Sequence, residues 1–318
     1  MSELIAFLVE NKINFEENIL LKKRTWLKTG GFVKVWIEPS NTEELISLAK
    51  YLYKASITYE VVGHTSNIYY LDSTNPEVIV STMNIKSFHY NNDVALCDCG
   101  VSVSKLSRYF VDLGYVGFSG LVNLPGTIAA AVVNNSSCFD CAISSLLKDV
   151  LFFNQKTGSV EYLSVEDLSY SHRSSILKRK ELTGIIISVS LNLKQGILIE
   201  EKKKALVATK IRKETQEPPA YTLGSVFAGL EKKTSLALNI YIKGFRLLTK
   251  LRIIQHKSLS ELLLKFYGYD FLLPYVSTKN INTFIWKPEI KDKKQMFDKY
   301  VEFMHIAFVD PKLEIEIR

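Results

Sequence analysis

The sequence lacks any apolar stretch long enough to cross a bilayer. Its longest apolar runs, "LPGTIAAAVV" and "GIIISVSLNL", are ten residues each, whereas a membrane-spanning helix needs about 20. The opening "MSELIAFLVENK" also lacks a basic start followed by an apolar stretch, so no export signal is visible. We therefore expect a cytosolic (cytoplasmic) protein with no membrane partner.

Cysteine is scarce. The four cysteines fall in two close pairs, Cys97 with Cys99 and Cys138 with Cys141. One alternative is a zinc site made of four thiolates, and the other is reduced structural thiols. The first pair lies in an alternating, strand-like stretch, which would put both side chains on one face as small apolar fillers. We therefore predict reduced thiols and no metal.

No arginine-rich tract and no tract of lysines mixed with aromatics stands out, although the formal net charge is +7. We take the lysines to be spread along the chain, and such an excess suits nucleotides and dinucleotides at least as well as nucleic acid. We expect no nucleic-acid partner. With 47% hydrophobic and 23% charged residues, the composition is globular. The 318 residues suggest more than one domain.

The first part of the chain predicts mixed helices and strands. A helix over 3–12 precedes a strand, a capped helix and a second strand within 34–63, with Ser40 or Asn41 as the cap. The remaining elements of this part are short strands at 77–82, 85–90 and 94–100, a helix at 102–114, and antiparallel strands within 146–164 and 182–193.

The second part begins with a charge run, "EEKKK" at 200–204, which opens a helix to about Glu214. We interpret the run as a solvated helix face and the helix as a link between two units. Beyond it, helices at 258–268 and 293–308 surround short strands. The fold class is α+β.

Three glycine-bearing turns, at 28–31, 63–67 and 124–135, offer backbone N–H groups where small residues let a ligand approach closely. Phosphates favour such turns, and a helix beginning near Thr127 would add its positive end. Each turn alone is a weak signal, and their order is a stronger one.

In that order the chain resembles the UDP-N-acetylenolpyruvylglucosamine reductase (MurB) family over nearly its whole length. The matching segments are "RTWLKTGGFVKVWIEPSNTEEL", "VGHTSNIYYLD", "LPGTIAAAVVNN", "SYSHRSSILK", "GSVF" and "LEIEIR". The resemblance implies an FAD-binding domain of the PCMH or vanillyl-alcohol-oxidase type in 1–198, with subdomains of about 1–63 and 64–198. A smaller α+β substrate domain would follow in 199–318.

The resemblance also implies an activity. NADPH would reduce bound FAD, and the enolpyruvyl group of UDP-N-acetylglucosamine enolpyruvate would be reduced to UDP-N-acetylmuramate, in peptidoglycan precursor synthesis. Arg173 would hold the substrate carboxylate, Glu316 would help polarise the enolate, and Ser225 would deliver the proton. As a donor, Glu316 would need a raised pKa, and Ser225 a hydrogen-bonded relay or a very basic carbanion.

The flavin contacts implied by the resemblance lie in two loops. They are Gly63, His64, Thr65, Ser66 and Asn67 in the first loop, and Pro125, Gly126, Thr127 and Asn135 in the second. His64 has two interpretations, a loop histidine bonded to backbone or phosphate and a covalent flavin anchor. We expect a monomer whose partners are the UDP-sugar and NADPH.

The chain departs from the family pattern at several positions. His64 and Thr65 replace two glycines, Ala129 and Ala130 replace a glycine pair, and "AGL" follows "GSVF" where the family has x-N-P. These departures leave two alternatives beside the reductase. One is a flavoprotein acting on another nucleotide sugar, and the other is a binding protein whose crowded loops no longer hold flavin.

Overall fold

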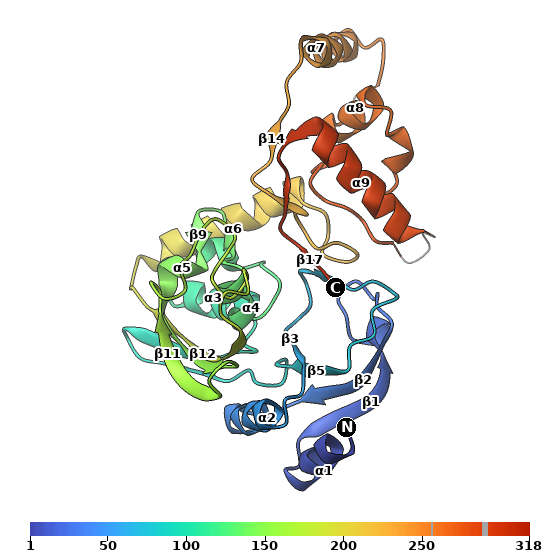
Figure 1. Cartoon of the computed structure of the whole chain (residues 1–318). Helices are drawn as coiled ribbons and strands as arrows, with labels where there is room; N and C mark the ends of the chain where they lie inside the picture. The colour runs from blue at the N-terminus through green and yellow to red at the C-terminus, as the bar shows by residue number, and fades with distance from the viewer. Residues whose placement is uncertain (256, 288–291) are drawn as a thin grey trace. The chain divides into compact units, whose positions relative to one another are not determined.

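The computed structural model describes residues 1–255, 257–287 and 292–318 (Figure 1). The chain divides into two compact units, one formed by 1–66 with 72–210 and the other by 67–71 with 211–318. No helix in the described ranges has both the length and the apolar character of a transmembrane span.

The first sheet of the first unit has the strand order β1-β2-β5-β3. Its strands are β1 (Asn14–Leu20), β2 (Phe32–Glu38), β5 (Val78–Ser81) and β3 (Glu60–Val62). The predicted first helix, α1 (Ser2–Glu10), ends two residues early, and Lys12 beyond it has a φ of 54°. Helix α2 (Thr42–Lys54) begins after Asn41, whose side chain accepts the Glu44 N–H, so Asn41 is the cap.

The second sheet is antiparallel and has the order β11-β10-β12-β7-β6. Its strands are β11 (Ser159–Ser164), β10 (Leu147–Asn154), β12 (Gly184–Asn192), β7 (Val94–Asp98) and β6 (Phe88–Tyr90). Side chains from α3 (Val103–Asp112) and α4 (Ile128–Val133) share one apolar core with this sheet. The predicted antiparallel pair is confirmed, and Gly158, in the turn between β10 and β11, has a φ of 70°.

The expectation that Cys97 and Cys99 share one core face is wrong. Both are fully buried, but Cys97 packs in the core of the second sheet and Cys99 in the core of the first. The reason is that β7 ends at Asp98 and the alternation ends with it. Cys138 and Cys141 are free cysteines that lie opposite each other in a small hairpin, β8 (Ser137–Cys138) with β9 (Cys141–Ala142). Helix α5 (Ile143–Leu146) follows this hairpin.

Helix α6 (Leu198–Thr215) contains the point where the two units divide. Its charge run is not a fully solvated face, because Glu201 is only 2% exposed and its Oε1 accepts from Lys204 at 2.6 Å. The backbone of Gly196 lies close to this side chain, since a Cβ added there would be 3.8 Å from Glu201 Cγ.

The second unit contains the predicted helices α8 (Leu259–Phe266) and α9 (Lys293–Ala307). It also contains α7 (Leu236–Lys250), which sequence patterns did not indicate. Between α8 and α9, Phe284 forms a single antiparallel bridge with Val276. The short strands are β4 (Ile68–Tyr69), β13 (Phe227–Ala228), β14 (Glu231–Lys232), β15 (Phe308–Val309), β16 (Lys312–Leu313) and β17 (Glu316–Ile317).

Candidate functional site

The two predicted flavin loops, which begin at Gly63 and at Pro125, touch each other within the first unit. Strand β3 ends at Val62, and Gly63 follows it with its backbone against the Thr127 side chain. A Cβ at Gly63 would lie 2.4 Å from Oγ1 of Thr127, so only glycine allows this approach. The two loops that the sequence predicts to bind one cofactor are therefore neighbours.

The side chains of His64 and Thr65 both turn toward Trp26. The Oγ1 of buried Thr65 accepts the backbone N–H of Trp26 at 2.8 Å. The His64 ring meets the Trp26 ring edge-on, with 4.7 Å between the ring centroids. Partial burial lowers the pKa of His64 below its usual value. Both side chains are therefore engaged by the protein, and Thr65 takes a φ of 51° where the family has glycine. Whether they crowd a bound flavin stays an open alternative.

In the second loop, Gly126 has a φ of +116°, which a side chain would strain. A Cβ at Gly126 would lie 3.4 Å from Oγ of Ser66, so the first loop also borders this position. Thr127 caps α4 by accepting the Ala130 N–H at 3.4 Å. Pro125 precedes this pair and is half-buried.

Helix α4 begins where the sequence predicts, but its first amides are not available to a phosphate. The Ile128 N–H donates to Val101 and the Ala129 N–H to Cys99. The 28–31 turn is likewise filled by protein, since a Cβ at Gly31 would lie 2.5 Å from Oδ1 of Asn75. The remaining candidate cradle is the contact of the 63–66 and 125–127 segments.

Arg173 lies in a tight turn between β11 and β12, and this segment contacts the last residue of α4 through Ser175. Ser171 and Ser174 bond each other at 3.0 and 3.1 Å, and Arg173 between them has a φ of 57°. Such a conformation is uncommon for a residue other than glycine. The Asn135 Nδ2 donates to the Ser171 carbonyl at 2.9 Å, so Asn135 anchors the arginine turn.

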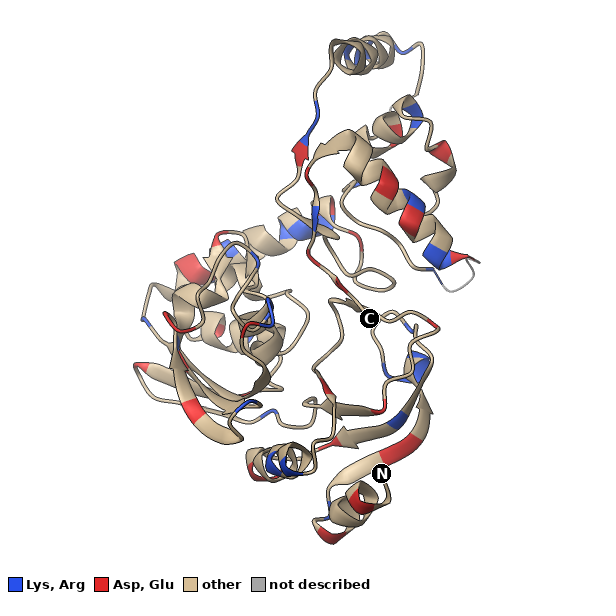
Figure 2. Ribbon diagram, viewed as in Figure 1, with Lys and Arg blue, Asp and Glu red and all other residues tan. Residues whose placement is uncertain are grey.

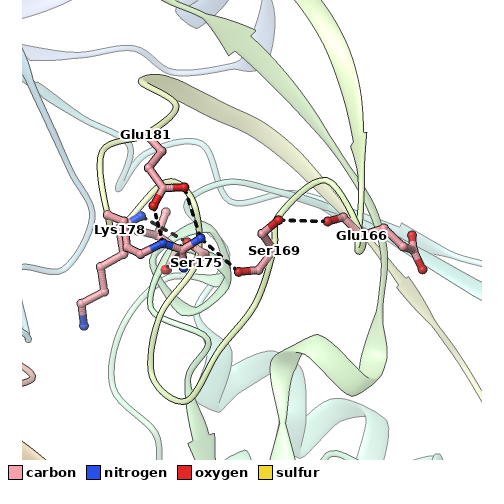
Figure 3. Close-up of polar contacts among 7 residues, drawn as sticks. Glu166, Ser169, Ser175, Lys178 and Glu181 are labelled. Carbon is pink, nitrogen blue, oxygen red and sulfur yellow. Dashed lines mark hydrogen bonds and ion pairs between the residues drawn. The ribbon is translucent and has the colours of Figure 1, made fainter.

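The segment around this turn is fastened at both ends (Figure 3). The Ser175 hydroxyl donates to the Val133 carbonyl at 2.6 Å and accepts the Lys178 N–H at 3.2 Å. Arg179 contacts Oε1 of Glu181 at 2.7 Å and the Ser169 carbonyl at 3.2 Å. The turn is therefore held at a fixed position beside the second loop.

The residues present fit a flavin nucleotide. Asn135, which has a φ of 43°, carries a buried Oδ1 that has no hydrogen-bond partner in the described ranges. A buried polar atom without a hydrogen-bond partner is costly, so in native proteins such an atom usually binds a ligand or an ordered water. Gly63 and Gly126 bring the backbone of the two predicted flavin loops together, as an FAD site requires.

In the second unit, Ser225 precedes a short hydrogen-bonded ladder. Strand β13 pairs antiparallel with β16, and the Val226 carbonyl accepts the Glu314 N–H at 2.8 Å. Extending this register puts Ser225 level with Ile315, one residue before Glu316. The half-buried Ser225 hydroxyl has no hydrogen-bond partner among residues 1–255, 257–287 and 292–318, so the relay neighbour is not seen there.

Asn282 fixes the same ladder, a role that sequence reasoning missed. Its Oδ1 accepts the Phe227 N–H at 2.9 Å, and its Nδ2 donates to the Phe227 carbonyl at 2.7 Å. Its own carbonyl accepts the Val226 N–H at 2.8 Å. A polar residue at the start of an apolar "NTFIW" run was the available signal.

Glu316 is tied to the first flavin loop. Its N–H donates to the Asn67 carbonyl at 2.9 Å, and the Asn67 Nδ2 donates to the Glu314 carbonyl at 3.2 Å. Strand β17 thereby runs parallel with β4. Arg318 contacts Oε2 of Glu316 through two nitrogens, at 2.6 and 3.1 Å, which leaves Oε1 outside this ion pair.

The structure thus groups the predicted residues in two sets. The first unit joins Gly63 to Ser66 with Pro125 to Thr127 and joins Asn135 with the Arg173 turn. The second unit joins Asn67 and Glu316 and places Ser225 in the adjoining ladder. The convergence of Arg173, Ser225 and Glu316 on one ligand stays a prediction.

Comparisons with known proteins point in one direction. The FAD binding domain family matches residues 33–161. The UDP-N-acetylenolpyruvoylglucosamine reductase of Prochlorococcus marinus is 31% identical over 240 residues, which are 74% of this chain and 81% of that protein. The enzyme of the same name from Caldicellulosiruptor bescii is 28% identical over 225 residues, 71% of each chain.

A solved structure shares the fold. The UDP-N-acetylenolpyruvylglucosamine reductase (MurB) from Thermus caldophilus gives a TM-score of 0.67 at 20% identity. The match covers 96% of this chain and 99% of that one. This likeness agrees with the α+β class expected for the chain.

Proposed function

Because the chain belongs to the UDP-N-acetylenolpyruvoylglucosamine reductase family, we propose that it uses FAD and NADPH to reduce the enolpyruvyl group of UDP-N-acetylglucosamine enolpyruvate. The observation that carries the proposal is the pair of hydrogen bonds between Asn67 and the Glu314–Glu316 segment. These bonds tie a predicted catalytic carboxylate to the end of a predicted flavin loop. FAD, when bound, supplies hydride-transfer chemistry.

Arg173 binds and orients the substrate carboxylate in this proposal. Its planar guanidinium can make two parallel bonds to a carboxylate, which a lysine ammonium cannot. Asn135 holds the turn that presents it, through the Ser171 carbonyl. The strained φ of 57° at Arg173 is then a cost that the turn bears for positioning.

Ser225 delivers a proton to the carbon next to the carboxylate. Saturating the double bond needs one hydride and one proton on neighbouring carbons, so a residue of the protein must donate the proton. The Gly224 before Ser225 has a φ of +75°, a backbone conformation that favours glycine, and open space at its Cβ position. Asn282 and Glu314 hold the next two peptide groups in place.

Glu316, as a protonated carboxyl, would donate a hydrogen bond to the enolate that hydride addition leaves on the substrate, before the proton transfer. Arg318 orients its carboxylate by binding Oε2, so Oε1 is assigned to the substrate. Arg318 is itself placed against the Tyr70 ring at 5.9 Å. The assignment of these three roles rests on the family resemblance and on the local geometry of each residue.

The test is a substrate-dependent oxidation. Purified protein should show bound flavin absorbance near 450 nm, and NADPH oxidation should accelerate when UDP-N-acetylglucosamine enolpyruvate is added. A colourless protein that takes up no added FAD would contradict the proposal. The "AGL" at 228–230 favours a second candidate, a flavoprotein for another nucleotide sugar. Protein that holds FAD but responds only to a different nucleotide sugar would establish it.

A further inference from the structure

Helix α7 and the turn after it carry an unusual distribution of charge. Residues 232–260 contain seven lysines and arginines and no aspartate or glutamate. Removing these seven from the 40 basic residues of the chain leaves 33, which the 33 acidic residues balance. The charge of this segment therefore equals the net charge of +7, while the other 33 basic residues are spread along the rest of the chain as expected.

The inner face of α7 is packed on the second unit. Leu238 and Ile242 are buried, and the Tyr241 ring lies 5.4 Å from that of Phe266 on α8. These residues recur at three- and four-residue spacing, so they form one stripe of the helix. The stripe accounts for how α7 is held, and it leaves the other faces to solvent.

The outer face is apolar and exposed. Leu236, Ile240 and Leu247 are 79%, 61% and 56% exposed, and at about 100° per residue they lie on one face. Leu251 and Ile253 continue the exposed apolar surface beyond the end of the helix. Single exposed aliphatic side chains are ordinary, whereas an exposed apolar face bordered by charges of one sign is a candidate binding surface.

A cationic ridge borders this apolar face. Lys243, Arg246 and Lys250 are exposed and lie between the apolar face and the packed stripe. Figure 2 shows no acidic residue on α7. Below the helix, the Lys257 ammonium lies 5.6 Å from the Phe245 ring. The pKa of Lys257 is lowered by the neighbouring ammonium of Lys265 on α8. A bound anion would offset the repulsion between these two cations.

We propose that α7 lies on an anionic lipid surface, with Leu236, Ile240 and Leu247 in the acyl boundary and the cationic ridge among the headgroup phosphates. A helix with an apolar face and lysines or arginines beside it binds membranes in this way. At 15 residues it lies on the surface and does not span it. The proposal departs from our expectation of no membrane partner.

Other occupants fit less well. A second copy of the chain would bring seven cations against seven, with no acidic residue in the segment to offset them. A nucleic acid would bind the cations but leave the aliphatic face in water. An anionic bilayer satisfies both faces at once.

The proposal is tested by vesicle flotation of the full chain. Vesicles of equal parts phosphatidylglycerol and phosphatidylcholine should carry the protein, and vesicles of phosphatidylcholine alone should not. Raising the salt to about 0.5 M should weaken the binding. Changing Lys243, Arg246 and Lys250 to glutamine should lower the partition coefficient roughly a hundredfold, at about 1 kcal/mol per charge.

The apolar face is tested by Ile240→Ser with Leu247→Ser, which should also abolish flotation. The matched control is Ile199→Ser with Leu206→Ser on α6, which exposes aliphatic side chains to a similar degree among charges of both signs. Circular dichroism and flavin absorbance should be unchanged in every variant. Because flotation needs no flavin or substrate, its outcome is independent of the proposed activity.

Three outcomes would overturn the proposal. The first is equal flotation on neutral and anionic vesicles, and the second is a serine pair that floats like the unaltered protein. The third is a wild-type dimer that the serine pair converts to a monomer, which would make the face a self-association surface. A Leu247→Trp variant adds a positive readout, since its emission should shift to shorter wavelength on anionic vesicles only.

Discussion

The backbone N–H of Glu316 donates to the carbonyl of Asn67 at 2.9 Å, which joins strand β17 to the last residue of the first flavin loop. The Asn67 side chain reinforces the contact by donating to Glu314. The position predicted to touch flavin thus has a second task, the placement of a predicted catalytic carboxylate. Its substitution should therefore affect turnover through Glu316.

Asn67→Ala should lower substrate turnover while the protein still binds FAD. The change removes the bond to Glu314, which contributes on the order of 1 kcal/mol to folding and holds β17 in register. Turnover by NADPH oxidation, FAD affinity by fluorescence and the melting temperature measure the three effects. Asn11→Ala, which removes an exposed bond to the Phe7 carbonyl, is the control and should leave turnover unchanged. Loss of FAD binding with normal turnover in FAD-saturated protein would refute the positioning role.

Arg173→Asn should raise KM for the UDP-sugar and lower kcat without lowering the melting temperature by much. Asparagine adopts positive φ more readily than arginine, so the turn is preserved while the guanidinium is lost. Lys180→Asn is a matched control, because Lys180 is also a cation at positive φ, 60°, in the same segment. If both variants reduce turnover equally, Arg173 has no special contact with substrate.

Much of the fold follows from local sequence patterns. The alternation in β10, β11 and β12 and the helical period of α2, α3, α8 and α9 predicted those elements, because each buries one face in a core. Helix α7 escaped prediction because its apolar residues cover two faces, only one of which is packed. Cys99 was assigned to the wrong core because a residue alternation does not tell where a strand ends.

The site was predictable only in part. The motifs located the glycine loops, Arg173, Ser225 and Glu316, but not the side chains that hold them. Asn135 with Ser171, Thr65 with Trp26, and Asn282 with Phe227 are bonds between residues 36, 39 and 55 positions apart. Such partners depend on tertiary packing, which no local pattern encodes.

Thr65→Val should destabilise the protein and weaken FAD binding. Valine keeps the shape but removes Oγ1, which leaves the Trp26 N–H without its acceptor at a cost of about 1–3 kcal/mol. Chemical denaturation with and without FAD measures both effects. Thr157→Val, at an exposed hydroxyl that bonds Ser159, is the control and should change stability little. Unchanged stability of Thr65→Val would show that the Trp26 contact does not support the loop.

His64 should make stability depend on pH. Because partial burial lowers its pKa in the folded protein, the unfolded chain takes up the proton first as the pH falls. The contribution of neutral His64 to the free energy of unfolding is fully present above the usual histidine pKa of about 6.5. It is lost as the pH falls through that value toward the lowered pKa. His64→Asn should flatten the stability profile between about pH 7 and 5. His89→Asn, at an exposed strand position, is the control. An unaltered profile in His64→Asn would rule out this titration.

Ser225→Ala should slow substrate reduction by about a hundredfold or more while leaving the reduction of bound flavin by NADPH intact, because a lost proton donor acts only on the substrate half of the reaction. Stopped-flow absorbance at 450 nm separates the two half-reactions. Ser225→Cys keeps a proton at nearly the same position and should recover part of the rate, whereas a serine that only shapes the turn would give equal rates for both variants. Asn282→Ala should also slow the substrate half, because Asn282 fixes the peptide groups that follow Ser225. Equal slowing of both half-reactions in Ser225→Ala would mean that the hydroxyl supports the fold and donates no proton.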